Sequence, residues 1–145
     1  MKKLAVVLVV LSMLVPVASA HAEEDARLYA LGMVSASNLY FSYLVLGTVA
    51  DGYASGGYGA DMATNLTEEA IALTRSSIDA LQMLVSDSAI AGDDRDVVEG
   101  LIETHQLLLR QAIGLLSYIE DPENTEEFLR YRDLAWKNIS QMLHF

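Results

Sequence analysis

The sequence predicts an all-α protein: an antiparallel, up-down-up-down four-helix bundle that follows a cleaved signal peptide. After the first twenty residues, apolar residues recur at intervals of three and four, which is the spacing of one face of a helix. The alternating pattern of strands joined by hairpin turns does not occur, and Pro122 is the only proline beyond the first twenty residues. The remaining chain of about 125 residues suffices for one modest hydrophobic core.

The amino-terminal segment has the pattern of a secretory signal peptide. Lys2 and Lys3 supply positive charge, residues 4–17 form an almost unbroken apolar run, and residues 18–20 are the small residues that a signal peptidase reads. The apolar run is shorter than the roughly 20 residues that a membrane span needs. We therefore expect residues 1–20 to be removed on export, which leaves no stable membrane anchor.

Two cleavage sites fit the small-residue rule. Cleavage after Ala20 makes His21 the first mature residue, whereas cleavage after Ala22 makes Glu23 the first. In both cases the lysine-containing start and the Ala-x-Ala end indicate a bacterial protein that is periplasmic or secreted. Residues 21–145 form the single bundle domain in this interpretation.

Composition excludes several classes of function. The chain has no cysteine, which excludes disulfides, thiol nucleophiles, iron–sulfur clusters and covalently attached haem. Its formal charge is −11, and loss of the two amino-terminal lysines leaves seven basic and twenty acidic side chains, a charge of −13. So acidic a chain is not expected to bind nucleic acid, because phosphates require clustered Lys and Arg. Motifs for nucleophilic catalysis or phosphate binding are absent too, so we expect no enzymatic activity.

The first helix is expected to run from about residue 23 to residue 53. Acidic residues at 23–25 suit the positive end of the helix dipole. The glycine-rich residues 55–59 follow its end, and we expect this link to be a flexible connector. One face of the helix carries Leu28, Leu31, Ser35, Leu39, Ser42, Leu46 and Val49.

Three further helices are predicted after this link. The second begins near Thr67, and the third follows a loop at residues 91–94. The fourth begins at Asp121-Pro122, because Asp caps helix amino termini and Pro is tolerated at the first helical position. The links are short, so consecutive helices must be antiparallel neighbours. The inward stripes are Ala70, Ile71, Thr74, Ile78, Leu81 and Val85 in the second helix; Val98, Leu101, Ile102, His105, Leu108, Leu109, Ala112, Leu115, Leu116 and Ile119 in the third; and Phe128, Leu129, Arg132, Trp136, Ile139 and Leu143 in the fourth.

His105 lies within the apolar stripe of the third helix and is therefore expected to point inward. Counting along antiparallel helices places several polar residues at its depth, namely Ser35, Asn38, Thr74, Ser77 and Tyr131 or Arg132. One interpretation is a buried polar layer whose members satisfy one another and fix the register. The alternative is a ligand-binding site between the helices, formed by His105, Ser35, Asn38 and Ser77.

The two chain ends suggest a different kind of site. If His21 is the mature amino terminus, it could join His144 and Met142 in a copper site, because imidazole and thioether ligands suit copper. Met33 and His144 could alternatively hold a b-type haem. Chain ends are usually poorly ordered, so no metal ligand and no cofactor is assigned.

Aromatic residues crowd the first helix. Tyr40, Phe41 and Tyr43 surround more of that helix than one core stripe requires, and Tyr53 lies near its end. Aromatic side chains are enriched in protein interfaces. We therefore predict that Tyr40, Phe41, Tyr43 and Tyr53 form the interface of a homodimer or of a complex with an unknown protein partner; ordinary burial in the core is the alternative.

These features together favour an exported, non-catalytic protein that acts by binding another protein. Two alternatives stay open. One is a metal- or haem-binding bundle that uses His105 or the end of the bundle with His21 and His144. The other is a small-ligand, sensor-like bundle that uses the polar layer around His105.

Overall fold

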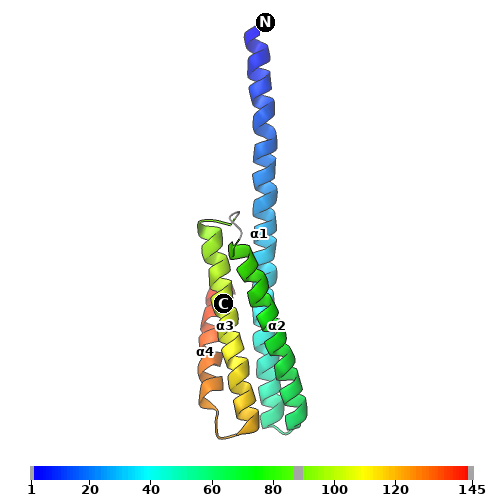
Figure 1. Ribbon diagram of the computed structural model, residues 1–145, viewed down its shortest axis with the longest axis vertical. Coiled ribbons are helices and arrows are strands. Elements are labelled where there is room, and N and C mark those ends of the chain that lie inside the picture. Colours follow the sequence, from blue (N-terminus) through cyan, green and yellow to red (C-terminus); the bar gives the residue numbers. More distant parts are fainter. Residues whose placement is uncertain (1, 87–89, 144–145) are drawn as a thin grey trace. The chain divides into compact units, whose positions relative to one another are not determined.

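The computed structural model describes the backbone of residues 2–86 and 90–143 and, within these ranges, the side chains from residue 26 onward except residue 27. Over this part of the chain it has four α-helices and no strand, as the sequence predicts (Figure 1). The helices are α1 (Lys2–Ala54), α2 (Ala60–Ser86), α3 (Asp93–Glu120) and α4 (Glu126–Leu143).

The chain divides into two compact units, residues 1–33 and residues 34–145. The first unit holds the amino-terminal part of α1, which is helical from Lys2 and not only from residue 23, because no turn residue separates the apolar run from the residues after it. The segment Leu28–Ala54 is long and apolar enough to cross a membrane, a test that signal sequences and core helices also pass. Removal of residues 1–20 on export stays a prediction.

In the second unit, the last part of α1 and helices α2, α3 and α4 lie side by side, with consecutive helices antiparallel (Figure 1). α3 packs against both α2 and α4. The Asn38 side-chain nitrogen donates a hydrogen bond to the Ser77 hydroxyl (3.3 Å), which joins α1 to α2. The rings of Tyr43 and Trp136, with centroids 5.3 Å apart, join α1 to α4. The arrangement is compatible with the predicted four-helix bundle.

The core follows the predicted apolar stripes. Its most deeply buried apolar side chains include Leu39 and Leu46 of α1, Leu108 and Leu115 of α3, and Ile139 of α4. All five lie on the stripes that helical spacing predicts. Two residues predicted to face inward from α4, Leu129 and Trp136, are exposed instead, because the buried side of α4 is centred on Phe128, Ala135 and Ile139.

Threonines in the core satisfy their hydroxyl groups within their own helices. Thr67, Thr74 and Thr104 each donate a hydrogen bond to the carbonyl oxygen four residues earlier, at 2.7, 2.7 and 2.9 Å. Such a bond meets the need of the hydroxyl without a partner on another helix. These three residues can therefore fill core volume much as valine would.

α2 begins earlier than predicted, at Ala60 and not near Thr67. Ala63 is already fully buried against the core, so packing extends the helix toward its amino terminus. Asp61 lies in the first turn, where its charge suits the helix dipole. The link between α1 and α2 is thereby reduced to residues 55–59.

This link is a hydrogen-bonded turn and not the flexible connector predicted from its glycines. The Tyr58 N–H donates to the Gly52 carbonyl (2.9 Å), and the Gly56 N–H donates to the Tyr53 carbonyl (3.0 Å). Gly56 has a φ of 74°, a conformation that residues with a side chain rarely adopt. The glycine therefore permits a tight turn rather than disorder.

α4 begins at Glu126 and not at Asp121-Pro122. Asp121 has an extended backbone (φ −135°, ψ 103°), and its N–H donates to the Ser117 carbonyl (2.9 Å), so this residue ends α3. The Asp121 carboxylate accepts the N–H of Glu123 (3.1 Å), which starts a turn. The prediction was wrong because Asp121 caps the end of one helix and not the start of the next.

α3 and α4 approach closely at Gly114. A Cβ atom at this position would lie 2.6 Å from the backbone nitrogen of Phe128 and 2.9 Å from its Cα. The missing side chain lets the first turn of α4 rest directly on α3. Gly100, on the same helix, has more room: a Cβ atom there would lie 3.4 Å from the terminal methyl group of Met142.

We expect Gly114→Ala to lower the free energy of unfolding by about 1–3 kcal/mol, because the clash is with backbone and the helices must move apart. Gly100→Ala is the matched control. It should be neutral or stabilising by up to about 1 kcal/mol, because alanine favours the helix and the Met142 side chain can adjust. Urea denaturation followed by circular dichroism measures both. Equal effects of the two substitutions would contradict the close packing at Gly114.

Candidate functional site

A long stretch of α1 carries no charged side chain. Between Leu28 and Ala50 there is no Asp, Glu, Lys or Arg, although the chain holds twenty acidic and nine basic side chains. On the side turned away from the core, Val34, Phe41 and Val45 are exposed, and Phe41 is 64% accessible to solvent. Their spacing of seven and four residues aligns them along one strip of the helix.

This strip continues onto α2. The hydrogen bond between Asn38 and Ser77 lies at the junction of the two helices. Leu73, one turn before Ser77, is 70% exposed, and Ala80, one turn after it, is exposed too. We name the surface formed by Val34, Phe41, Val45, Leu73 and Ala80 the apolar face.

Charged residues border the apolar face. Glu69, one turn before Leu73, is exposed and marks its edge on α2. On the other side of α1, toward α4, the Arg132 guanidinium lies 3.8 Å from the position of a Cβ on Gly47, and Asp133 is exposed. An apolar centre with a polar rim is the usual composition of a protein interface.

Of the predicted interface residues Tyr40, Phe41, Tyr43 and Tyr53, Phe41 is the one that is largely exposed. Tyr40 and Tyr43 are half-buried, and Tyr43 packs against Trp136. Tyr53 is used within the bundle, because its hydroxyl donates to the Ile119 carbonyl (3.0 Å) and so joins α1 to α3. The structure thus gives Tyr53 a role in the core and leaves Phe41 exposed to solvent.

Val34, Val45 and Leu73 are missing from the predicted interface. For the two valines a signal exists in the sequence, namely the unbroken absence of charge along this part of α1. For Leu73 there is no comparable signal, because a single apolar residue on an outward helix side is ordinary. Its place beside α1 depends on how the two helices pack.

His105 is buried as predicted, with 1% of its surface exposed. Its Nδ1 lies 2.8 Å from the carbonyl oxygen of Leu101, one turn earlier on α3. A carbonyl only accepts hydrogen bonds, so we assign the ring proton to Nδ1, which leaves Nε2 as an acceptor. Nε2 has no hydrogen-bond partner in the described part of the chain. Burial lowers the pKa of His105 below its ordinary value of 6.5, although the hydrogen bond to Leu101 acts in the opposite direction.

Of the polar residues predicted at the depth of His105, Ser35, Asn38 and Ser77 make other contacts or none that reach the imidazole by a hydrogen bond within the described residues. Asn38 and Ser77 bond to each other in an exposed position, and Ser35 is half-buried. No hydrogen bond connects these three to the imidazole within the described residues.

Two residues of α4 make different contacts along α3. The hydroxyl of Thr104, the neighbour of His105, lies 3.8 Å from the Met142 sulfur. The Arg132 guanidinium lies over the ring of Phe128, and the backbone of Phe128 lies against Gly114. About 14 Å of helix separates Gly114 from His105. Met142 of α4 therefore contacts the residue next to His105, whereas Arg132 contacts Phe128 near Gly114.

Gln111 is a second buried polar residue on α3. It is fully buried, and neither its side-chain nitrogen nor its side-chain oxygen has a hydrogen-bond partner among the residues described. Leaving such groups unpaired costs about 1–3 kcal/mol for each residue. Gln111 was not among the predicted site residues. The signal for it in the sequence is its position directly before Ala112, which lies on the apolar stripe of the third helix.

The candidate metal ligands at the chain ends lie mostly outside the described residues. This holds for His144 and for the side chain of His21, whereas Met142 is described and contacts Thr104. The described residues contain no group of three or more His, Cys, Asp or Glu side chains that could hold a metal ion. A copper site there stays a prediction.

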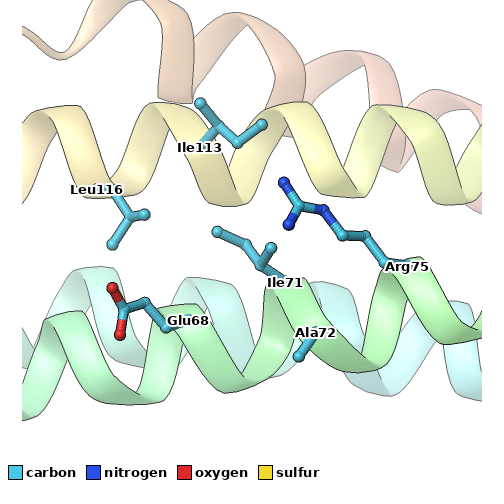
Figure 2. Close-up of a pocket in the computed structure, with 6 residues that line it drawn as sticks. All are labelled: Glu68, Ile71, Ala72, Arg75, Ile113 and Leu116. Carbon is cyan, nitrogen blue, oxygen red and sulfur yellow. The ribbon is translucent and has the colours of Figure 1, made fainter.

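A groove of about 380 Å³ runs between α2 and α3 (Figure 2). Ile71, Ile113 and Leu116 give it an apolar floor, and Glu68 and Arg75 of α2 stand on either side of Ile71 (Figure 2). Both charged side chains are exposed, where water screens their interactions. The groove shows that these charges of α2 point toward α3, away from the apolar face.

No protein-family model, curated protein or solved structure matches this chain. Its class therefore follows from its architecture and surface. Over the described residues it is an all-α protein with four helices, two buried side chains that have unpaired polar atoms, and an uncharged apolar face.

We expect His105 to make stability depend on pH. Its pKa is lower in the folded state than in the unfolded chain, so the unfolded chain binds the proton first as pH falls. The stability due to neutral His105 is therefore present above pH 6.5 and is lost below it, by at most about 1.4 kcal/mol per pH unit.

His105→Leu removes this dependence, because leucine does not titrate. Denaturant unfolding of both proteins on each side of pH 6.5 measures it. Relative to the wild type, the variant should be more stable at the lower pH than at the higher pH. Both proteins have the same carboxylates, so the contribution of these groups cancels in the comparison. Parallel pH profiles would contradict a buried neutral imidazole.

Proposed function

We propose that this chain is an exported, non-catalytic protein of the bacterial periplasm that binds another protein surface through the apolar face. The observation that carries the proposal is Phe41, a phenylalanine exposed by 64% in the middle of an uncharged surface. The signal-peptide pattern of residues 1–20 supports export.

Removing the apolar face from water supplies the driving force for binding. Burial of apolar surface contributes roughly 25 cal/mol per Å², and aromatic side chains near the centre of an interface contribute most. Single exposed apolar residues are normal on a monomer. Phe41 and Leu73, however, lie on adjacent helices beside the contact of Asn38 with Ser77, and a contiguous apolar patch marks an interaction site.

The chemistry of the apolar face favours binding over reaction. The side chains of Val34, Phe41, Val45 and Leu73 contain no group that transfers a proton or attacks a substrate. The acidic residues elsewhere on the chain favour solubility of the free protein despite this patch. The proposal therefore assigns the face a role in recognition.

A photo-reactive benzoyl-phenylalanine at position 41 should form a covalent adduct of one defined mass when intact cells are illuminated. The matched control carries the same group at Leu134, which is exposed on α4. Leu134 lies two residues from Trp136 and so points to the opposite side of that helix. Gel electrophoresis and mass spectrometry identify the adducts. Adducts that do not differ between the two positions would overturn the proposal.

A second candidate function is the binding of a ligand in the core, and His105 favours it. Its Nδ1 bonds to the Leu101 carbonyl, while Nε2 has no hydrogen-bond partner among the residues that the structure describes. Metal-bound histidines are usually oriented by such a bond from the other ring nitrogen. The unpaired amide of Gln111 adds a second buried polar group on the same helix.

Native intact-mass spectrometry of protein recovered from its own periplasm tests this second candidate. A bound species that is present in the wild type and lost in His105→Leu, with the helical circular dichroism retained, would support it. A bare polypeptide mass in both proteins would count against it. The same spectrum identifies the first mature residue as His21 or Glu23.

A further inference from the structure

We infer that the partner of the apolar face is a second copy of this chain, which packs its own apolar face against the first about a two-fold axis. This inference rests on the proposed function and names its partner. It uses the described surface of α1 and α2 alone.

Charge is the first argument. A carboxylate or ammonium group buried against the apolar face would lose its hydration without gaining a counter-charge, because α1 offers none between Leu28 and Ala50. The partner must therefore present a surface that is uncharged over several helical turns. The same face on a second copy meets this requirement, and it keeps the acidic residues of both copies outside the contact.

Shape is the second argument. A two-fold interface uses the same patch on both copies, so that patch must carry both protruding and small side chains. On the apolar face, Phe41 and Leu73 protrude, with 64% and 70% of their surfaces exposed. Ser37 and Ala80, exposed on the same sides of α1 and α2, are small. The large residues of one copy can therefore fit against the small residues of the other.

The polar groups at this surface are compatible with burial. The Asn38 amide already donates to the Ser77 hydroxyl (3.3 Å). Ser77 in turn donates to the Leu73 carbonyl (3.1 Å), and Thr48 donates to the Leu44 carbonyl (2.9 Å). Because these bonds lie within one copy, dimer formation leaves them intact, which limits the cost of removing water.

A lipid surface is a weaker match. Membrane-surface helices are usually flanked by Lys and Arg, whereas residues 28–50 of α1 contain neither and Glu69 lies at the edge of the face.

Sedimentation velocity of the mature protein, which begins at His21 or Glu23, tests the inference over a wide range of protein concentration. We expect a dimer for the wild type. Phe41→Glu should raise its dissociation constant at least about ten-fold, because two carboxylates are then placed in the contact. Leu134→Glu is the matched control and should leave the dimer unchanged. Circular dichroism checks that each variant folds, and Leu73→Glu replaces Phe41→Glu if that variant does not.

A second readout uses the absence of cysteine from the chain. A single cysteine introduced at Ala80 should form a disulfide between two copies under mild oxidation, whereas one at Leu134 should not. A monomeric wild type, together with an Ala80→Cys variant that forms no disulfide between copies, would overturn the second copy as partner, also if the monomer sediments with vesicles of phosphatidylethanolamine and phosphatidylglycerol.

The photo-crosslinking experiment separates the two proposals. A monomer whose position 41 reacts with a different protein would refute the dimer and leave the proposed function standing. A monomer without any specific adduct would refute both. An adduct of twice the chain mass, together with a dimer in sedimentation, would support both.

Discussion

The second unit depends on the burial of the broad apolar side of α3. This helix packs against α2 on one side and α4 on the other, and the Tyr53 hydroxyl of α1 reaches its Ile119 carbonyl. Leu108 and Leu115 are fully buried in the middle of these contacts. A helix that contacts all the others must fit each of them at once. Gly114 is the clearest sign of that constraint, because α4 lies where a side chain would be.

The same packing explains why α1 has apolar surface left over. Leu39 and Leu46 meet the core, and the glycine-containing turn after Ala54 brings α2 against one side of α1. Nothing in the described fold covers Phe41 and its neighbours on the outward side. The interior shows the reverse mismatch, because His105 and Gln111 are buried with polar atoms that have no partner among the described residues. Unpaired buried polar atoms cost free energy and exposed apolar surface favours association, so each mismatch supports one of the two candidate functions.

Helical spacing predicted the four helices and most of the core correctly, because the period of apolar residues is a local property of the chain. It failed at helix boundaries that are set by a tertiary contact or by a turn. Ala63 extends α2 by packing, and Asp121 ends α3 by its own hydrogen bonds. The candidate site was predicted in part: Phe41 is exposed, whereas Tyr53 serves the core. Leu73 could not be identified, because its neighbour on α1 is about thirty residues away in sequence.

The sequence by itself determined the all-α class, most of the residues that face inward on the helices, and the absence of charge between Leu28 and Ala50 of α1. These properties follow from local backbone geometry and from composition. Only the tertiary structure decided which apolar residues of α1 stay exposed beside α2, and whether His105 finds a partner for its second nitrogen. Those outcomes depend on the rotation and spacing of helices relative to one another. The rotation and spacing of the helices are set by contacts between side chains that are far apart in the chain, so no local sequence pattern encodes them.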